Sequence, residues 1–327
     1  MSNLEKDPLE LLVREDEADE VPDATGRTVE ILDPREVPLG GPRAMGVRRT
    51  LPQRARSLIG AWCFVDHYGP EAVEMDVPPH PHTGLQTVSW LFSGEIEHRD
   101  TVGSHAIINP GELNLMTAGR GIAHSEVSVP SVTGAPRMLH GAQLWIALPD
   151  GARHREPFFE NFVPQPFTFG SATVRVFIGT LAGVSSPVRV FTELIGAQLE
   201  IPAGATVVIP VLSGHEHGVL VDAGDVTVDG TAAPVSHLAY VPPGTDALTI
   251  TATTDARLLL IGGAPLGEQI VMWWNFIGRD HDEIQRFRDE WQAGLAQRPG
   301  RFGVLNGYDG HPLPAPQLPP IRLKPRG

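Results

Sequence analysis

The fold is decided by two stretches of sequence, HPHTGLQTVSW at residues 80–90 and MTAGRGIAHSE at residues 116–126. Each stretch carries two residues of a metal-ligand type, two positions apart. These are His80 and His82 in the first stretch, and His124 and Glu126 in the second. Residues i and i+2 of a β-strand point to the same face of a sheet. Two such strands side by side would aim three imidazoles and one carboxylate at one point, a donor set that suits divalent Fe, Ni, Cu, Zn or Mn.

The residues around these pairs have the pattern of an all-β protein. His82 and His124 lie 42 residues apart, which places both pairs in one domain but not in one hairpin. From Thr28 onward, short runs of Val, Ile, Leu, Trp and Thr alternate with Gly, Pro, Asn and Asp, as in β-barrels and sandwiches. The 35 glycines and 31 prolines indicate many tight turns, because apolar runs persist between them.

The sequence also repeats itself once over a long period. WLFSGEI around Gly94 resembles VLVDAGDV around Gly224, which lies 130 residues later. In the same way, Gly119 corresponds to Gly244 at an offset of 125 residues. Offsets of this length indicate a duplicated domain rather than a solenoid.

A helix is expected after the second copy of the domain. Four apolar residues recur there at three- and four-residue steps and share one helical face: Ile284, Phe287, Trp291 and Leu295. Asp280, followed three residues later by Glu283, is typical of a capped helix start. We therefore divide the chain into a flexible arm (1–27), a first barrel (28–150), a linker (151–166), a second barrel with the C-terminal helix (167–299) and a Pro/Gly-rich tail (300–327).

Further motifs surround the two ligand pairs, namely FVDHYGP at residues 64–70, SGEIEHRD at 93–100 and NPGE at 109–112. Taken in order, they closely resemble the bacterial pirin-like proteins of the pirin family, within the cupin superfamily. The match is nearly word for word from about Trp62 to Glu126, and looser to about Gly303.

This resemblance implies an all-β bicupin, that is, two cupin β-barrels, with a metal held in the first. It implies that the ligands are His80, His82, His124 and Glu126, usually of iron. It also implies that some bacterial relatives oxidise quercetin-like flavonols with O2, whereas eukaryotic relatives act as nuclear co-regulators of transcription. Many members carry Glu where this chain has Gln86, but in pirins that Glu is not the usual ligand.

We expect one divalent transition metal, with Fe(II) first and Ni, Cu, Zn, Mn or Co as alternatives. The metal's identity stays open because affinity order and availability decide it as much as the ligands do. Neutral imidazole is the metal-binding form, so affinity should fall below the usual histidine pKa of about 6.5. Gln86, Thr117 and Ser125, or backbone carbonyls, are candidates for hydrogen bonds to the ligands, because metal-bound histidines usually donate their other N–H to an acceptor.

The main functional hypothesis is a metal-dependent dioxygenase of the quercetin 2,3-dioxygenase type, acting on flavonols or related phenols. Its partners would be the small phenolic substrate and O2, and Glu126 would be the catalytic residue that accepts the substrate hydroxyl proton. One alternative is a non-catalytic, iron-binding module that senses redox state and binds a protein partner. Another is an enzyme acting on a different small oxygenated substrate, because cupins host many chemistries.

Composition argues against several other classes of function. The net charge of −14 disfavours direct binding to nucleic acid or to anionic membranes, which require basic surfaces. No run of 18 apolar residues occurs, which argues against a membrane span. The acidic N-terminus argues against a signal peptide. Cys63 is the single cysteine and cannot form an internal disulfide, so a cytoplasmic location is expected.

Two other histidine motifs could carry chemistry. His98-Arg99-Asp100 could supply an acid/base group beside the substrate, but a strand end with an Arg–Asp charge pair is the favoured interpretation. His215-Glu216-His217 suggests a second metal site, but the second copy of the domain has no counterpart of His124. We therefore interpret that motif as a surface turn.

Overall fold

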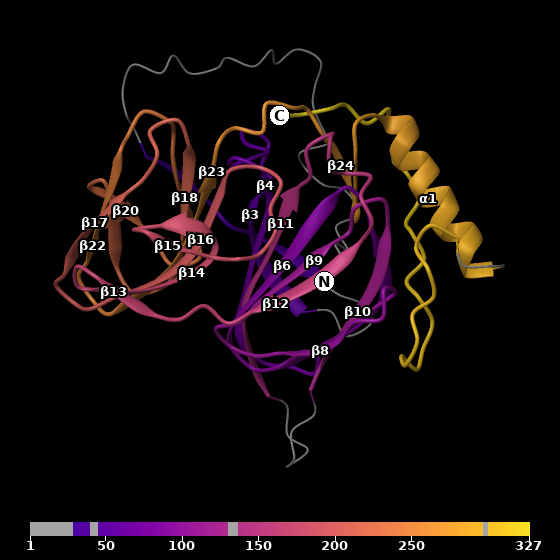
Figure 1. Cartoon of the computed structure of the whole chain (residues 1–327), viewed down its shortest axis with the longest axis horizontal. Coiled ribbons are helices and arrows are strands. Elements are labelled where there is room, and N and C mark those ends of the chain that lie inside the picture. Colours follow the sequence, from indigo (N-terminus) through magenta and orange to yellow (C-terminus); the bar gives the residue numbers. More distant parts are fainter. Residues whose placement is uncertain (1–28, 40–44, 130–136, 297–299) are drawn as a thin grey trace.

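The computed structural model describes residues 29–39, 45–129, 137–296 and 300–327. The expected arm, residues 1–27, lies outside these ranges. The described chain forms two β-barrels side by side and one helix, α1, which lies beside the first barrel and away from the second (Figure 1). The predicted all-β bicupin with a short C-terminal helix is confirmed.

The first barrel consists of two facing antiparallel sheets. The larger has the order β12-β9-β6-β11-β4-β3-β2, with the bounds Phe158–Phe162, Leu113–Thr117, Leu85–Ser93, Met138–Ala147, Trp62–Ala72, Met45–Leu51 and Arg35–Leu39. The smaller has the order β5-β10-β7-β8, with the bounds Asp76–His82, Ile122–Ser128, Ile96–Asp100 and His105–Ile108. Side chains that alternate inward fill the space between them, including Phe64 stacked on Trp145 with ring centroids 4.0 Å apart.

The second barrel repeats this design. Its larger sheet has the order β1-β21-β18-β23-β16-β14-β13, with β15 paired to β14. The bounds are Glu30–Leu32, Leu238–Val241, Glu216–Ala223, Ala256–Gly263, Leu194–Ile201, Ala172–Leu181, Phe167–Phe169 and, for β15, Val184–Ser185. Its smaller sheet has the order β17-β22-β19-β20, with the bounds Thr206–Pro210, Ala247–Ala252, Val226–Val228 and Thr231–Ala233.

The strand orders explain the internal repeat. The series β9-β6-β11-β4 in the first barrel corresponds to β21-β18-β23-β16 in the second. Gly94 follows β6 and Gly224 follows β18, and their φ angles are +88° and +89°. A Cβ on Gly94 would lie 2.7 Å from the carbonyl oxygen of Met138, and one on Gly224 would lie 2.5 Å from that of Asp255. Both turns therefore require glycine for the same two reasons, a left-handed backbone and a close neighbouring strand.

Two edge strands belong to a different barrel from the one that the expected domain boundaries assign to them. Strand β1, in the range assigned to the first barrel, pairs with β21 of the second barrel. Strand β12, in the range assigned to the linker, pairs with β9 of the first barrel. Each added strand covers backbone N–H and C=O groups that a sheet edge would otherwise expose.

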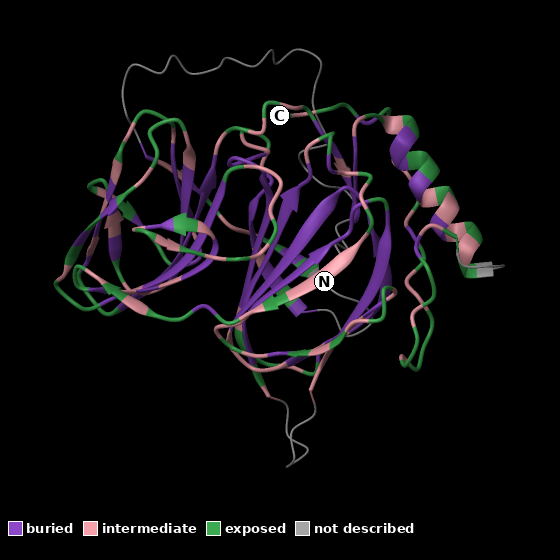
Figure 2. Ribbon diagram, in the orientation of Figure 1, coloured by how far each residue is buried: buried purple, intermediate pink, exposed green. Residues whose placement is uncertain are grey.

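The two barrels share a continuous apolar interface. Trp90 of the first barrel stacks on Phe177 of the second, with ring centroids 4.6 Å apart, and its indole N–H donates to Oε1 of Gln198 at 2.8 Å. The indole N–H of Trp62 likewise donates to the carbonyl oxygen of Gly262 at 3.1 Å. Figure 2 shows buried residues along the central strands, with more exposure on the outer strands and loops.

Helix α1 (His281–Ala296) follows the hairpin of β24 (Val271–Trp273) and β25 (Phe276–Gly278). The expected cap forms, because Oδ1 of Asp280 accepts the backbone N–H of Glu283 at 2.8 Å. Three residues of the predicted apolar face, Ile284, Phe287 and Trp291, are buried, whereas Leu295 in the last turn is 37% exposed. No helix in the described ranges is long and apolar enough to cross a membrane.

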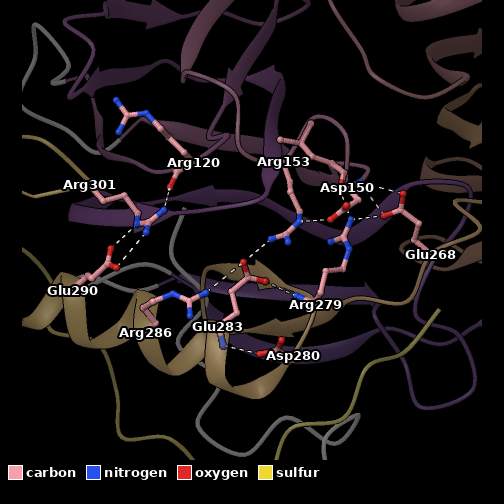
Figure 3. A network of polar contacts seen from close by, with 11 residues as sticks. Arg120, Asp150, Arg153, Glu268, Arg279, Asp280, Glu283, Arg286, Glu290 and Arg301 are labelled. Atoms are coloured by element: carbon pink, nitrogen blue, oxygen red, sulfur yellow. Dashed lines mark hydrogen bonds and ion pairs between the residues drawn. The ribbon is translucent and has the colours of Figure 1, made fainter.

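Ion pairs and the C-terminal tail attach α1 to the first barrel, although α1 follows the second barrel in sequence. Arg153 contacts Glu283 at 2.5 Å, and Arg301 contacts Glu290 at 2.5 Å while also donating to the carbonyl oxygen of Arg120 (Figure 3). Farther along, the backbone N–H of Leu313 donates to the carbonyl oxygen of Pro79 on β5 at 2.8 Å. The tail therefore lies against the strand that carries His80 and His82.

Candidate metal centre

Strands β5 and β10 place the two ligand pairs together. They are antiparallel neighbours, with His124 opposite His80 and Ile122 opposite His82. Strand β5 contains Pro78, Pro79 and Pro81 and lies at the edge of its sheet, where a residue without an N–H is tolerated. A register irregularity between His124 and Glu126 shifts the carboxylate relative to β5.

The three histidines form one buried cluster. Their ligand-type nitrogens lie within 4.8 Å of one another, and Nε2 of His82 is 3.1 Å from Nε2 of His124. His80 donates Nδ1–H to the carbonyl oxygen of Pro78 at 2.8 Å, so its Nε2 carries the lone pair. Among the residues that the structure describes, that Nε2 is buried without a hydrogen-bond partner. Buried lone pairs left unpaired are costly, and their convergence fits a bound divalent transition metal.

Glu126 flanks this cluster on the His124 side. Its carboxylate forms a second group within 4.8 Å together with His98 and His124. The Ser89 hydroxyl donates to Oε1 of Glu126 at 3.2 Å, which orients the carboxylate. Glu126 is only 1% exposed, so a cation at the cluster would compensate its buried negative charge.

Burial keeps the three imidazoles neutral. It lowers the pKa of His80 to about 3, and it lowers the pKa values of His82 and His124 well below 6.5, with the nearby His80 acting in the same direction. Protons therefore compete with a metal for the folded site only at acidic pH, lower than the value of about 6.5 expected for unperturbed histidine.

His98 lies in this site. Its motif does end a strand, as expected, because β7 ends at Asp100, but the expected Arg–Asp charge pair is wrong. Arg99 pairs with Glu97 at 2.7 Å rather than with Asp100. His98 points inward, with Nδ1 at 3.3 Å from Nδ1 of His124 and Nε2 at 3.3 Å from Oδ2 of Asp100. The same i, i+2 rule that pairs His124 with Glu126 places His98 and Asp100 on one face of β7, and could have identified them.

The residues expected to support the ligands have other contacts. Gln86 donates to Oγ1 of Thr117 at 2.9 Å and to the carbonyl oxygen of Arg189 at 3.0 Å. Ser125 alternates with His124 and Glu126 and therefore faces the other side of β10. There it lines a cavity of about 230 Å³ together with Arg99 and Tyr308 of the tail. None of the residues that line this cavity belongs to the histidine cluster.

The predicted surface turn at His215-Glu216-His217 is wrong for His217, which lies on a buried strand. His215 does precede that strand. His217 is 1% exposed on β18, and burial, aided by the neighbouring His215, lowers its pKa to about 4. His215 pairs with Glu193 at 3.1 Å. Glu216 accepts the backbone N–H of Gly60 at 2.6 Å, which connects the two barrels. Among the described residues, the groups of possible metal ligands include neither His215 nor His217.

A third cluster, His67, His140 and Asp222, lies between the barrels. Oδ1 of Asp222 is 2.7 Å from Nε2 of His67 and 2.5 Å from Nε2 of His140. Burial raises the pKa of Asp222, but the hydrogen bonds from His140 and His67 outweigh it and the net shift is downward. Arg257 contacts Oδ2 at 2.6 Å and already compensates the carboxylate charge. We therefore interpret this cluster as a polar contact between the barrels.

Comparison with known proteins identifies both domains. A model described as pirin matches residues 44–146, and a model of the pirin C-terminal cupin domain matches residues 196–297. A Pseudomonas aeruginosa protein named "Putative quercetin 2,3-dioxygenase" is 42% identical over 290 residues, 87% of this chain and 89% of that protein. A pirin-like protein of Caulobacter vibrioides is 35% identical over 279 residues, 82% of this chain and 94% of that protein.

Solved structures agree with this result. The crystal structure of a quercetin 2,3-dioxygenase from Acinetobacter baumannii has a TM-score of 0.82 and 35% identity, over 90% of this chain and 97% of that chain. A bacterial pirin from Escherichia coli, in complex with nickel(II), has a TM-score of 0.57 and 21% identity, over 73% of this chain and 100% of that chain. At that identity the similarity shows the fold alone. Because both pirin domain models match and the relatives cover most of its length, this chain belongs to the pirin family.

Proposed function

We propose that this protein is a metal-dependent dioxygenase that cleaves quercetin-like flavonols or related phenols with O2. The observation that carries the proposal is the convergence of three buried, neutral histidines beside a buried glutamate. The names of the Pseudomonas and Acinetobacter relatives support the substrate class.

His80, His82 and His124 would hold the metal, with Glu126 as the fourth ligand. We expect Fe(II), with Ni, Cu, Zn, Mn or Co as alternatives that the same nitrogen and oxygen donors accept. When bound, such a metal supplies a Lewis acid that lowers the pKa of the substrate's 3-hydroxyl group, and open positions for substrate and O2.

Glu126 would act as the general base. Its carboxylate accepts the proton from the 3-hydroxyl group of the flavonol, leaving an electron-rich enolate that reacts with O2. The Ser89 hydroxyl, bonded to Oε1, keeps the carboxylate in one orientation. Both oxygen atoms of O2 enter the product as the central ring opens, so no other oxidant or reductant is needed.

Aromatic side chains pack against the site. The ring of Trp145 meets His82 edge to face, with centroids 5.2 Å apart, and is itself stacked on Phe64. Tyr68 is fully buried, and burial together with the nearby Glu126 raises the pKa of its hydroxyl well above 10. Tyr68 therefore stays protonated and does not compete with Glu126 as a proton acceptor.

The test begins with metal analysis of protein purified without chelator. Oxygen uptake is then measured with quercetin for samples loaded with iron, nickel or copper. The proposal requires stoichiometric metal and uptake that disappears in His124→Ala. Failure of every fully loaded sample to consume O2 would contradict the dioxygenase, and would favour the non-catalytic iron-binding module.

A further inference from the structure

We propose that Asp100 and His98 are positioning residues that fix the tautomer of His124, so that its Nε2 faces the metal. The proposal rests on the metal centre proposed above. It assigns a function to a chain of side-chain contacts, Asp100–His98–His124. This chain connects β7 to the neighbouring strand β10.

The direction of each hydrogen bond follows from the ends of this chain of contacts. If Nε2 of His124 is to present a lone pair beside Nε2 of His82, the proton of His124 must be on Nδ1. That Nδ1–H points to Nδ1 of His98 at 3.3 Å, which must then accept. His98 consequently carries its proton on Nε2, where it donates to Oδ2 of Asp100 at 3.3 Å.

Asp100 is anchored as an acceptor by the backbone. Its Oδ1 accepts the N–H groups of Val102 at 3.0 Å and Ser104 at 2.9 Å. Burial raises the pKa of Asp100, but the hydrogen bonds from His98 and Ser104 outweigh it, so the pKa is lowered. The far end of the chain of contacts is therefore an ionised carboxylate that can only accept.

The ring of His98 is also held in place. It stacks on Phe159 of β12, with centroids 4.7 Å apart and an interplanar angle of 22°, and it is 2% exposed. His80, by contrast, donates to a backbone carbonyl, which no side-chain substitution removes. His124, whose Nδ1 contacts a side chain, is thus a ligand whose tautomer a side-chain substitution can change.

Asp100→Asn should reverse the direction of the hydrogen bond between residue 100 and His98 without changing the shape of the side chain. The backbone N–H groups of Val102 and Ser104 still need an acceptor, so the amide oxygen takes the position of Oδ1. The amide NH2 then faces Nε2 of His98, which must accept and carry its proton on Nδ1. Two N–H groups would meet between His98 and His124, and the metal-binding tautomer of His124 would lose its acceptor.

Two substitutions of His98 separate hydrogen bonding from packing. His98→Gln keeps an oxygen that can accept from His124 and an NH2 that can donate to Asp100, but loses the stacked ring. His98→Phe keeps a ring against Phe159 but has no acceptor. The proposal expects tight metal binding in the Gln variant and weak binding in the Phe variant, whereas a packing role expects the reverse.

The experiment measures the affinity of metal-free full-length protein for Co²⁺ by competition with a chelator, together with the visible absorption of the Co²⁺ complex. Urea unfolding of each metal-free variant shows that it folds. We expect binding 10- to 100-fold weaker in Asp100→Asn and His98→Phe, with an altered spectrum, and within about threefold of wild type in His98→Gln.

Equal affinities in wild type, Asp100→Asn and His98→Phe would overturn the proposal, as would equal losses in His98→Gln and His98→Phe. If His98→Phe does not fold, the nearly isosteric Asp100→Asn decides. Affinity is measured without turnover, so a protein that shows the expected losses but does not oxidise flavonols contradicts only the proposed function. A wild-type protein that does not bind Co²⁺ contradicts both.

Discussion

His80 on β5 and His124 on β10 lie directly opposite each other in the strand register, with ring centroids 4.4 Å apart. The hydrogen-bonded ladder of two strands, rather than a loop, therefore sets their separation. Sites built on strands hold their groups more precisely than sites on loops. A substitution of one ligand should consequently leave the others in place.

Replacing His80 tests the cluster directly. His80→Ala removes one nitrogen donor, so the affinity for the metal should fall by more than the 10- to 100-fold that an outer hydrogen-bond partner is worth. Chelator competition measures this affinity. His154→Ala is the matched control, since His154 is exposed. Unchanged affinity in His80→Ala would remove His80 from the ligand set.

The free energy of unfolding of the metal-free protein should decrease as the pH is lowered. The pKa of His80 is about 3 in the folded state and about 6.5 when unfolded, and those of His82 and His124 are also lowered. Below about pH 6.5 the unfolded chain therefore binds more protons than the folded one. The free energy of unfolding should be highest above pH 6.5 and fall as the pH drops toward 4.

Urea unfolding of metal-free protein at pH 7.5, 6 and 5 measures this dependence. His154→Gln, which alters an exposed histidine, should follow the wild-type curve. Saturating metal should raise stability at each pH, because it binds only the folded state. Stability that stays constant from pH 7.5 to pH 5 would show that the histidines are not buried as neutral groups.

Glu126→Gln tests the general base. The amide keeps the shape and can still accept from Ser89, but it cannot take the substrate proton. Oxygen uptake per bound metal should fall about 10²- to 10⁴-fold. Glu97→Gln is the control, because Glu97 lies on the neighbouring strand β7 and pairs with Arg99. Unchanged uptake per metal in Glu126→Gln would assign the proton to another acceptor.

Packing of α1 against the C-terminal tail should contribute measurably to stability. Trp291 is 5% exposed, meets Phe302 edge to face and donates to the carbonyl oxygen of Leu313 at 2.8 Å. Trp291→Ala should lower the free energy of unfolding by about 3–5 kcal/mol. Leu295→Ala, in the exposed last turn, should change it by less than about 0.5 kcal/mol. Circular dichroism during urea unfolding distinguishes the two, and equal effects would contradict this packing.

Much of the fold could be predicted because its determinants are local in sequence. The spacing of His80 and His82, and of His124 and Glu126, places each pair on one strand face wherever the strands lie. The Asp280 cap and the apolar face of α1 follow from helical periodicity in the same way.

Long-range pairing decided the rest. Strand β1 joins the second barrel, and β12 covers an edge of the first, because sheet edges take the strand that completes their hydrogen bonds, wherever it lies in the sequence. The position of His98 behind His124 depends on the register of β7 against β10. The sequence by itself therefore determined which residues share a strand face, and only the tertiary structure decided which faces meet, because register and edge pairing are set by contacts between distant segments.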